Sequence, residues 1–187
     1  MTLLKRFLRR ASPDQRRVVL QPSSATQVLF VCMGNICRSP TAEGVFRSKV
    51  QAKGLQRRIA TDSAGTSKYH LGSPPDKRAV ALAEKRGYDL SGLCARQVEQ
   101  RDFALFHHIL AMDKVNLAAL HELCPHDHIS KIRLFTEFSA KYPYAEIPDP
   151  YFGAMDGFEL VLDMVEDAAK GLLDYIVIGG RAVSKLR

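Results

Sequence analysis

The chain has 187 residues, of which 46% are hydrophobic and 25% are charged, a composition typical of one soluble globular domain of ordinary size. Its formal net charge is +7, but the first 27 residues carry six basic side chains and one acidic one, so only +2 remains for the rest. The basic character therefore belongs mainly to the N-terminus, and we expect no nucleic-acid partner. No apolar run approaches the ~20 residues that a membrane-spanning helix needs, which predicts no stable membrane insertion.

Four cysteines are too few for a dense disulfide framework in a chain of this length, which favours free thiols in a reducing compartment, the cytoplasm. Residues 1–26 form a basic N-terminal extension. Three interpretations fit it: a flexible leader, an Arg-rich transit peptide for an organelle, or a short membrane-surface helix. We expect the folded domain at residues 27–178 and a short basic tail at 179–187.

The first elements in chain order are a buried strand and a helix. Residues 28–32 are continuously apolar, which is typical of a strand buried on both faces. Ser39 and Pro40 then predict the start of a helix, with Ser39 as its N-cap and Pro40 at its first position. Glu43 is expected in the first turn, where an acidic side chain is favourable.

Further strands alternate with helices along the rest of the chain. Strands are predicted at residues 58–62, 108–112 and 132–134. Helices are predicted from Pro74-Pro75 to Gly87, after the third strand around Val115, Leu117 and Leu120, and at residues 158–178. This alternation predicts an α/β fold, in which a four-stranded parallel sheet has helices on both faces. Ligands of such sheets bind at the carboxyl ends of the strands, so the loop after the first strand is the first candidate site.

That loop reads C-M-G-N-I-C-R-S-P (residues 32–40). A cysteine at a strand end that faces a helix N-terminus has its thiolate stabilised by free N–H groups and the helix dipole. Gly34 and Asn35 tolerate the left-handed backbone angles that turn successive N–H groups inward. Arg38 can bind two phosphate oxygens at once, and the Ser39 hydroxyl can donate to the thiolate. The spacing C-x5-R is weak by itself, but its place between strand and helix predicts a phosphate cradle, here residues 32–39.

Asp149 supplies a candidate proton donor. It lies in I-P-D-P-Y-F (residues 147–152), where two prolines stiffen the loop. A single carboxyl held near the cradle can protonate a leaving phenolate and later accept a proton from water. Taken alone, Asp-Pro is more often a simple turn.

The segment V-L-F-V-C-M-G-N-I-C-R-S-P-T-A-E resembles the signature of the low-molecular-weight protein tyrosine phosphatases. Further segments match that family in order: D-S-A-G-T-S (62–67), G-x-P-P-D (72–76), A-R-Q (95–97), A-M-D-K-x-N-L (111–117) and D-P-Y-F (149–152). The resemblance implies a flavodoxin-like three-layer sandwich, a phosphocysteine intermediate, no metal or other cofactor, and a tyrosine-phosphorylated protein as substrate. We expect a monomer or a weak dimer.

The resemblance also implies roles for individual residues. The catalytic groups are Cys32 as nucleophile, Arg38 as phosphate ligand and Asp149 as general acid. Substrate binding is assigned to Met33, Gly34, Asn35, Ile36, Cys37 and Ser39 in the cradle, with Tyr151 and Phe152 as an aromatic wall. Ser63 supports the loop, and a further apolar wall residue falls near Ile59.

Two positions leave alternatives open. Cys37 matches a second cysteine that traps an oxidised nucleophile as a reversible disulfide, but a small packed side chain is an equal interpretation. Many relatives carry a histidine two residues before A-R-Q, where this chain has Leu93, so we expect altered hydrogen bonding around Asn35.

Two other functions are compatible with a loop of this kind. An arsenate reductase uses a similar loop but relays electrons through a close pair of further cysteines, whereas Cys94 and Cys124 are 30 residues apart. A non-catalytic phosphate- or phosphotyrosine-binding module on the same fold would not need both Cys32 and Asp149. The cluster His121, Cys124, His126 and His128 fits no strong zinc pattern, so we expect no metal.

Overall fold

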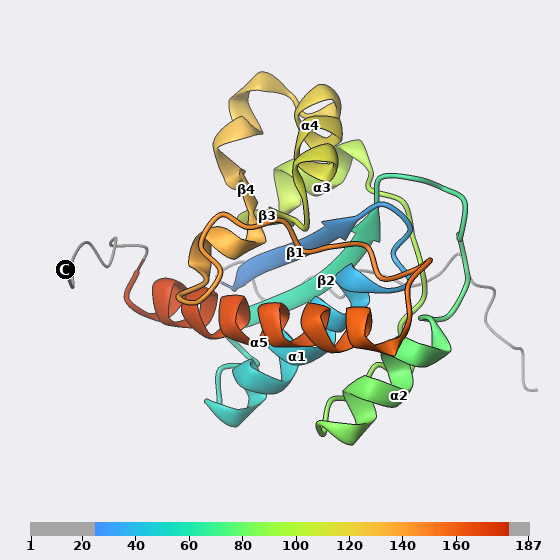
Figure 1. Ribbon diagram of the computed structural model, residues 1–187. Coiled ribbons are helices and arrows are strands. Elements are labelled where there is room, and N and C mark those ends of the chain that lie inside the picture. Colours follow the sequence, from blue (N-terminus) through green and yellow to red (C-terminus); the bar gives the residue numbers. More distant parts are fainter. Residues whose placement is uncertain (1–24, 180–187) are drawn as a thin grey trace, which may run out of the picture.

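The computed structural model describes residues 25–179 (Figure 1). The predicted N-terminal extension, apart from its last two residues, and the predicted C-terminal tail, apart from its first, lie outside the described residues.

Four parallel strands form the centre of the molecule in the order β2-β1-β3-β4. They are β1 (Thr26–Cys32), β2 (Ile59–Gly65), β3 (His108–Ala111) and β4 (Ile132–Leu134). Each predicted strand is present, and β2 continues three residues further than predicted, to Gly65. The predicted four-stranded parallel sheet is therefore confirmed.

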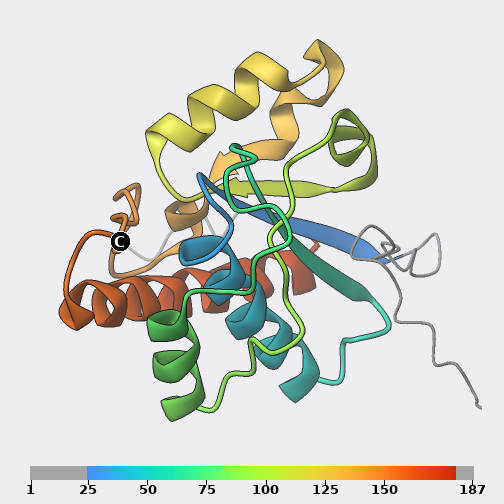
Figure 2. The same ribbon diagram turned by 90° about the vertical axis from the view of Figure 1, so that its right-hand side faces the viewer.

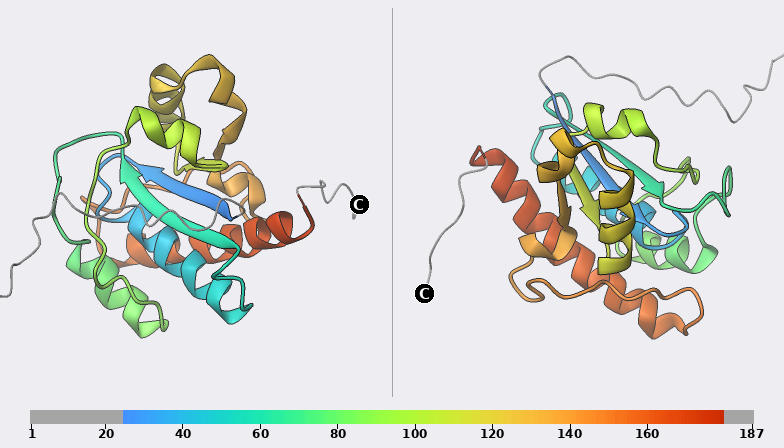
Figure 3. Two further views of the ribbon diagram at one scale, coloured as in Figure 1. Left: turned by 180° about the vertical axis from the view of Figure 1, so that it is seen from behind. Right: turned by 90° about the horizontal axis from the view of Figure 1, so that it is seen from above.

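Helices cover both faces of this sheet, which gives three layers (Figures 2 and 3). One face carries α1 (Arg38–Ala52), α2 (Lys77–Lys85) and α5 (Met155–Val177), and the other carries α3 (Gln100–Leu105) and α4 (Lys114–Leu123). Two short 3-10 helices, η2 (His126–Lys131) and η3 (Phe135–Phe138), flank β4. In residues 25–179, no helix is both long and apolar enough to span a bilayer.

The side chains of β1 show why its sequence has no polar face. Val28, Phe30 and Cys32 belong to the core under α1 and α5, whereas Leu29 and Val31 belong to the core under α3 and α4. Because successive strand residues point to opposite faces, a strand between two helix layers must be apolar at every position.

Four predictions about helix starts are wrong, and one of them is Pro40 at the first position of α1, where it is the third residue. The helix α1 begins at Arg38, its N-cap is Cys37, and no side chain caps it. The predicted N-cap, Ser39, is inside the helix because its hydroxyl bonds to the cradle, and Glu43 accordingly lies in the second turn. The helix α2 begins at Lys77, later than Pro74-Pro75, since Asp76 accepts from the N–H of Arg78 at 2.8 Å and caps it.

Candidate active site

The cradle connects β1 to α1 at the carboxyl end of the sheet. Its carbonyl groups point away from the loop's interior: those of Cys32, Met33 and Ile36 accept from the N–H groups of Thr66, Ser67 and Asp76 at 2.7–2.9 Å. Within residues 25–179, no acceptor is found for the cradle N–H groups of Gly34, Ile36, Cys37 and Arg38. These unpaired donors, next to a helix N-terminus, make the loop a binding site for an anion.

Cys32 lies inside this ring of donors. Its Sγ is 3.2 Å from the backbone nitrogen of Asn35, which donates to it, and 3.1 Å from the Ser39 hydroxyl. The side chain is buried. The N–H of Asn35 donates to this sulfur, and the Ser39 hydroxyl is close enough to donate to it as well.

Asn35 supports the cradle from behind. Its backbone has a positive φ of 54°, an unusual conformation that asparagine tolerates better than most residues. Its side-chain nitrogen donates to Ser39 at 2.9 Å and to Ser63 at 3.0 Å, and its oxygen accepts from the N–H of Arg96 at 2.9 Å. All the hydrogen bonds of this amide are thus made without the side chain of Leu93, which packs against the core.

Arg38 joins the cradle to two other loops. Its Nη1 donates to Asp113 at 2.5 Å and to the carbonyl of Ile147 at 3.1 Å, and its Nη2 donates to Asp149 at 2.6 Å. Burial by itself lowers the pKa of Arg38, but the negative charges of Cys32, Asp113 and Asp149 raise it above its ordinary value. The guanidinium therefore remains charged while buried.

The loop that carries Asp149 is held in place by α2. Arg78 donates to the carbonyls of Tyr151 and Gly153 at 2.9 and 3.2 Å while it pairs with Asp76. Asp149 itself accepts from the N–H of Tyr151 at 3.1 Å. Its carboxyl, 38% exposed, is thus fixed beside Arg38 and open to solvent.

Aromatic rings form the rim above the cradle. Phe152 contacts Tyr151 edge-on at a centroid distance of 4.9 Å, and Tyr151 lies 6.0 Å from His70, which contacts Tyr69. Phe152 is 95% exposed, so it is not a core residue. His70 lies over the cradle, since a Cβ added at Gly34 would be 3.0 Å from its ring.

The thiol of Cys37 differs from that of Cys32 in its surroundings. Burial, together with the negative charges of Asp76 and Cys32, raises the pKa of Cys37 to about 12. This side chain is therefore a neutral thiol at physiological pH. All four cysteines of the chain are unpaired.

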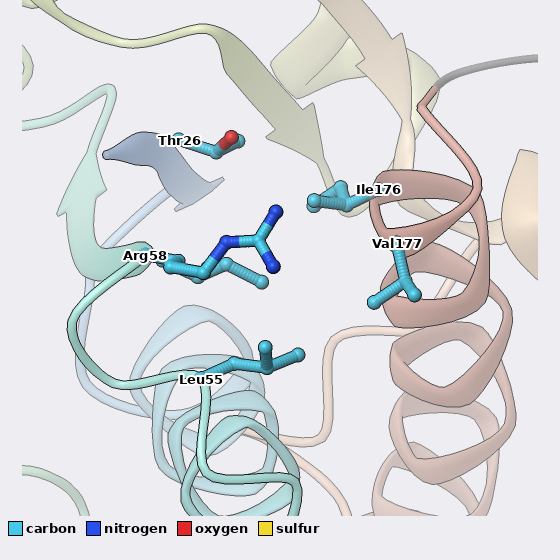
Figure 4. A pocket seen from close by; sticks show the side chains of 6 residues that line it. Thr26, Leu55, Arg58, Ile176 and Val177 are labelled. Atoms are coloured by element: carbon cyan, nitrogen blue, oxygen red, sulfur yellow. The ribbon is translucent and has the colours of Figure 1, made fainter. Parts of the chain in front are cut away.

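Ile59 does not belong to the substrate wall. It pairs with Thr26 at the start of the sheet, whereas the cradle begins where Cys32 pairs with Gly65. Six residues of strand separate the two ends by roughly 20 Å. Ile59 instead lines a pocket at that far end with Thr26, Leu55, Arg58, Ile176 and Val177 (Figure 4).

Several residues at the site were not assigned from sequence: Glu43, His70, Arg78, Arg96 and Asp113. For Asp113 a signal existed, because a polar residue directly after a buried strand lies at the carboxyl edge of the sheet. In the part of the chain that the structure describes, no three His, Cys, Asp or Glu side chains are grouped to hold a metal.

Comparison with known proteins matches the chain to one protein family. The family model described as low molecular weight phosphotyrosine protein phosphatase matches residues 27–183. A low molecular weight protein-tyrosine-phosphatase of Streptomyces coelicolor is 43% identical over 161 residues, which cover 83% of this chain and 98% of the relative. The human low molecular weight phosphotyrosine protein phosphatase is 39% identical over 150 residues, with 79% and 93% covered.

A solved structure shows the same fold. The protein tyrosine phosphatase of Entamoeba histolytica, crystallised with Hepes in its active site, superposes with a TM-score of 0.81 at 38% identity. The match covers 84% of this chain and 100% of the other. The flavodoxin-like sandwich that the sequence predicted is thereby confirmed.

Proposed function

This chain belongs to the low molecular weight phosphotyrosine protein phosphatases and is a protein-tyrosine phosphatase, and we propose that Cys32, Arg38 and Asp149 carry out its reaction. One observation supports this assignment above all. The loop with Cys32 and the loop with Asp149, more than 100 residues apart in sequence, are joined by the ion pair between Arg38 and Asp149 at 2.6 Å.

In the first step the Cys32 thiolate attacks phosphorus. The phosphate lies against the cradle residues Met33, Gly34, Asn35, Ile36, Cys37 and Ser39, and its oxygens accept from the N–H groups of Gly34, Ile36, Cys37 and Arg38 described above. Three of the five N–H groups of Arg38 are donated to Asp113, Ile147 and Asp149, which leaves two for a bidentate contact with phosphate. Arg38 thereby stabilises the charge on the equatorial oxygens in the transition state.

Asp149 acts on the proton at both steps. In its neutral form it protonates the leaving phenolate while the P–O bond breaks and the phosphocysteine forms. The resulting carboxylate then takes a proton from the water that attacks phosphorus, and the Ser39 hydroxyl assists departure of the Cys32 thiolate.

The aromatic rim suits a phosphorylated tyrosine. Tyr151 and Phe152 lie on the loop of the general acid, so a planar ring held between them brings its ester oxygen towards Asp149. A phosphoserine side chain is too short to use this wall. We therefore assign Tyr151 and Phe152 to substrate binding and Ser63 to support of Asn35.

Cys37 is proposed as a resolving thiol. Peroxide oxidises the Cys32 thiolate to a sulfenic acid, which removes one of the negative charges that raise the pKa of Cys37. The Cys37 thiol then loses its proton as its sulfur attacks the sulfenic acid, and a disulfide forms with loss of water. Four unpaired cysteines fit a reducing compartment, so we propose that the enzyme is cytoplasmic. We further propose that it is a monomer or a weak dimer.

Steady-state kinetics of two variants test the assignment. On a phosphotyrosine peptide, Cys32→Ser is expected to lose at least about 10³-fold in kcat, because the nucleophile is removed. Asp149→Asn is expected to lose about 10²- to 10⁴-fold, and less on an aryl phosphate whose leaving group needs no proton.

Matched controls are available for both changes. Cys124→Ser, at the C-terminal end of α4, and Asp156→Asn alter the same residue types away from the cradle and should retain activity. Equal activity of wild type and Cys32→Ser would refute the mechanism, and equal turnover of phosphoserine and phosphotyrosine peptides would refute the role of the aromatic rim.

A further inference from the structure

Glu43 is a buried carboxyl for which the reaction described above has no use. It lies on α1 and is only 6% exposed. Burial, and secondly the charge of Asp62, raise the pKa of Glu43 to about 7. Its close polar contacts are the Ser63 hydroxyl, which donates to its Oε2 at 2.6 Å, and Arg47 at 3.5 Å from its Oε1. Burial of a carboxyl costs free energy, and Glu43 has only one short hydrogen bond, from Ser63, to offset that cost. The position of Glu43 therefore points to a role beyond packing.

A continuous chain of hydrogen bonds leads from Glu43 to the nucleophile. Ser63 donates to Glu43 and accepts from the side-chain nitrogen of Asn35. The same nitrogen donates its other hydrogen to Ser39, whose hydroxyl contacts Cys32 Sγ. Each of these contacts is between 2.6 and 3.1 Å.

The donor and acceptor of each hydrogen bond in this series follow from Glu43, at the end away from Cys32. A carboxylate oxygen can only accept, so the one proton of Ser63 is committed to Glu43, and Ser63 can only accept from Asn35. Asn35 must then present its nitrogen to both serines. Ser39 consequently accepts from Asn35. Its own proton has two acceptors within reach, the Cys32 sulfur at 3.1 Å and the carbonyl of Ala64 at 3.3 Å, of which the thiolate is nearer and charged.

The reverse polarity would disable the cradle. If Ser63 donated to Asn35, the amide oxygen would have to face the serines and would also draw the Ser39 proton away from Cys32. The amide nitrogen would then face the N–H of Arg96, which is a donor too. Glu43 and the Arg96 N–H thus hold the amide of Asn35 in one orientation from opposite sides.

We propose that Glu43 is a positioning residue for catalysis, which directs the Ser39 proton to the Cys32 thiolate through Ser63 and Asn35. This inference rests on the proposed role of Cys32 as nucleophile. The polarity requires that Glu43 accept at Oε2, as the carboxylate does while Arg47 faces Oε1; an acid with its proton on Oε2 would donate to Ser63 instead. The charged groups around it are Arg47 on its own helix and Asp62 and Arg96 across from it.

The test compares Glu43→Leu, which removes the acceptor, with Glu43→Gln, which keeps one. For each, alkylation of Cys32 by iodoacetamide is followed against pH and resolved by residue with mass spectrometry, beside kcat/KM on a phosphotyrosine peptide. In Glu43→Leu the pH midpoint of alkylation should rise by about one unit, so that alkylation below the midpoint slows about tenfold. In Glu43→Gln the midpoint should stay at the wild-type value.

Two further variants separate this role from a general loss of stability. Asp167→Leu removes another serine–carboxylate bond, that to Ser139, away from the cradle, and should leave the midpoint unchanged. In a Ser63→Ala background, Glu43→Leu should produce no additional shift, because its path is already broken.

A negative result for Glu43 can be distinguished from a negative result for the proposed phosphatase mechanism. Absence of phosphotyrosine turnover in the wild type would refute the proposed function, whereas the alkylation midpoint reports on Glu43 regardless of turnover. The positioning role is refuted if Glu43→Leu alkylates with the wild-type midpoint, or if Glu43→Leu and Ser63→Ala shift it additively.

Discussion

The carboxylate of Asp113 accepts hydrogen bonds from two donors, one in α1 and one in α4. One carboxylate oxygen accepts from Arg38 at 2.5 Å, and the other accepts from the N–H of Asn116 at 2.6 Å and caps α4. A hydrogen bond to a charged partner contributes about 1.5–3 kcal/mol, and an N-cap contributes about 1 kcal/mol. The position of the phosphate ligand is therefore tied to the start of a helix outside the cradle.

The change Asp113→Asn is expected to separate these two contributions. Asparagine is as good an N-cap as aspartate, so the midpoint of thermal unfolding should change little. Arg38 loses an anionic partner, and kcat/KM on a phosphotyrosine peptide should fall about 10- to 100-fold. Asp113→Ala, which also removes the cap, should lose about 1 kcal/mol more of unfolding free energy. Wild-type kinetics in Asp113→Asn would contradict this role.

At the scale of elements, the contact between α5 and η3 determines the path of the chain towards Asp149. Gly171 of α5 lies against the backbone of η3, and a Cβ placed there would be 1.8 Å from the carbonyl oxygen of Phe138. Glycine is usually unfavourable inside a helix, so its presence here reflects the close approach of the two backbones.

The change Gly171→Ala should therefore destabilise the protein although alanine is the better helix former. Helix propensity favours alanine by about 1 kcal/mol. Overlap with a backbone atom cannot be relieved by rotation of a side chain, and we expect a net loss of about 2 kcal/mol in urea unfolding. Gly157→Ala in the same helix is the control, since its Cβ would make an ordinary contact of 3.6 Å with Pro150. A Gly171→Ala variant as stable as Gly157→Ala would contradict the packing argument.

For the whole molecule, a half-buried histidine and a buried glutamate give the free energy of unfolding opposite dependences on pH. Burial, and secondarily His107 and Arg133, lower the pKa of His108 to about 4. Its folded pKa is below the unfolded value of about 6.5, so it destabilises the fold as pH falls from 6.5 to 4. The pKa of Glu43 is raised to about 7, so its contribution is present at low pH and is lost as pH rises from about 4.5 to 7.

Replacing His108 is expected to remove the first of these effects. Between pH 7 and pH 4.5, the unfolding free energy of His108→Gln should fall less than that of the wild type, because the variant has no imidazole to bind a proton on unfolding. The expected difference is only about 1 kcal/mol, because solvent screens this half-buried ring. Urea titrations at the two pH values measure this difference. The exposed His121→Gln is the control, and identical pH dependence in all three proteins would contradict the assignment.

Much of the fold was predictable from local patterns. The apolar run of β1 and the short segment Ile132–Leu134 both form the strands that were predicted. The helix α3 was missed because its six residues are too few to show a helical period. Ser39 was misassigned as a cap because its hydroxyl is used by the cradle, and this competition between partners is not encoded in the neighbouring residues.

The sequence by itself determined the order of the elements, the cradle and the family, since these depend on residues only a few positions apart. The tertiary structure decided which groups meet. Arg38 pairs with Asp113 and Asp149 across 75 and 111 residues because the order β2-β1-β3-β4 places β3 beside β1. The sequence indicates for Glu43 only a favourable interaction with a helix dipole. Because α1 packs on β2, the carboxyl of Glu43 is buried against Ser63 and ends the series of hydrogen bonds that leads to Cys32.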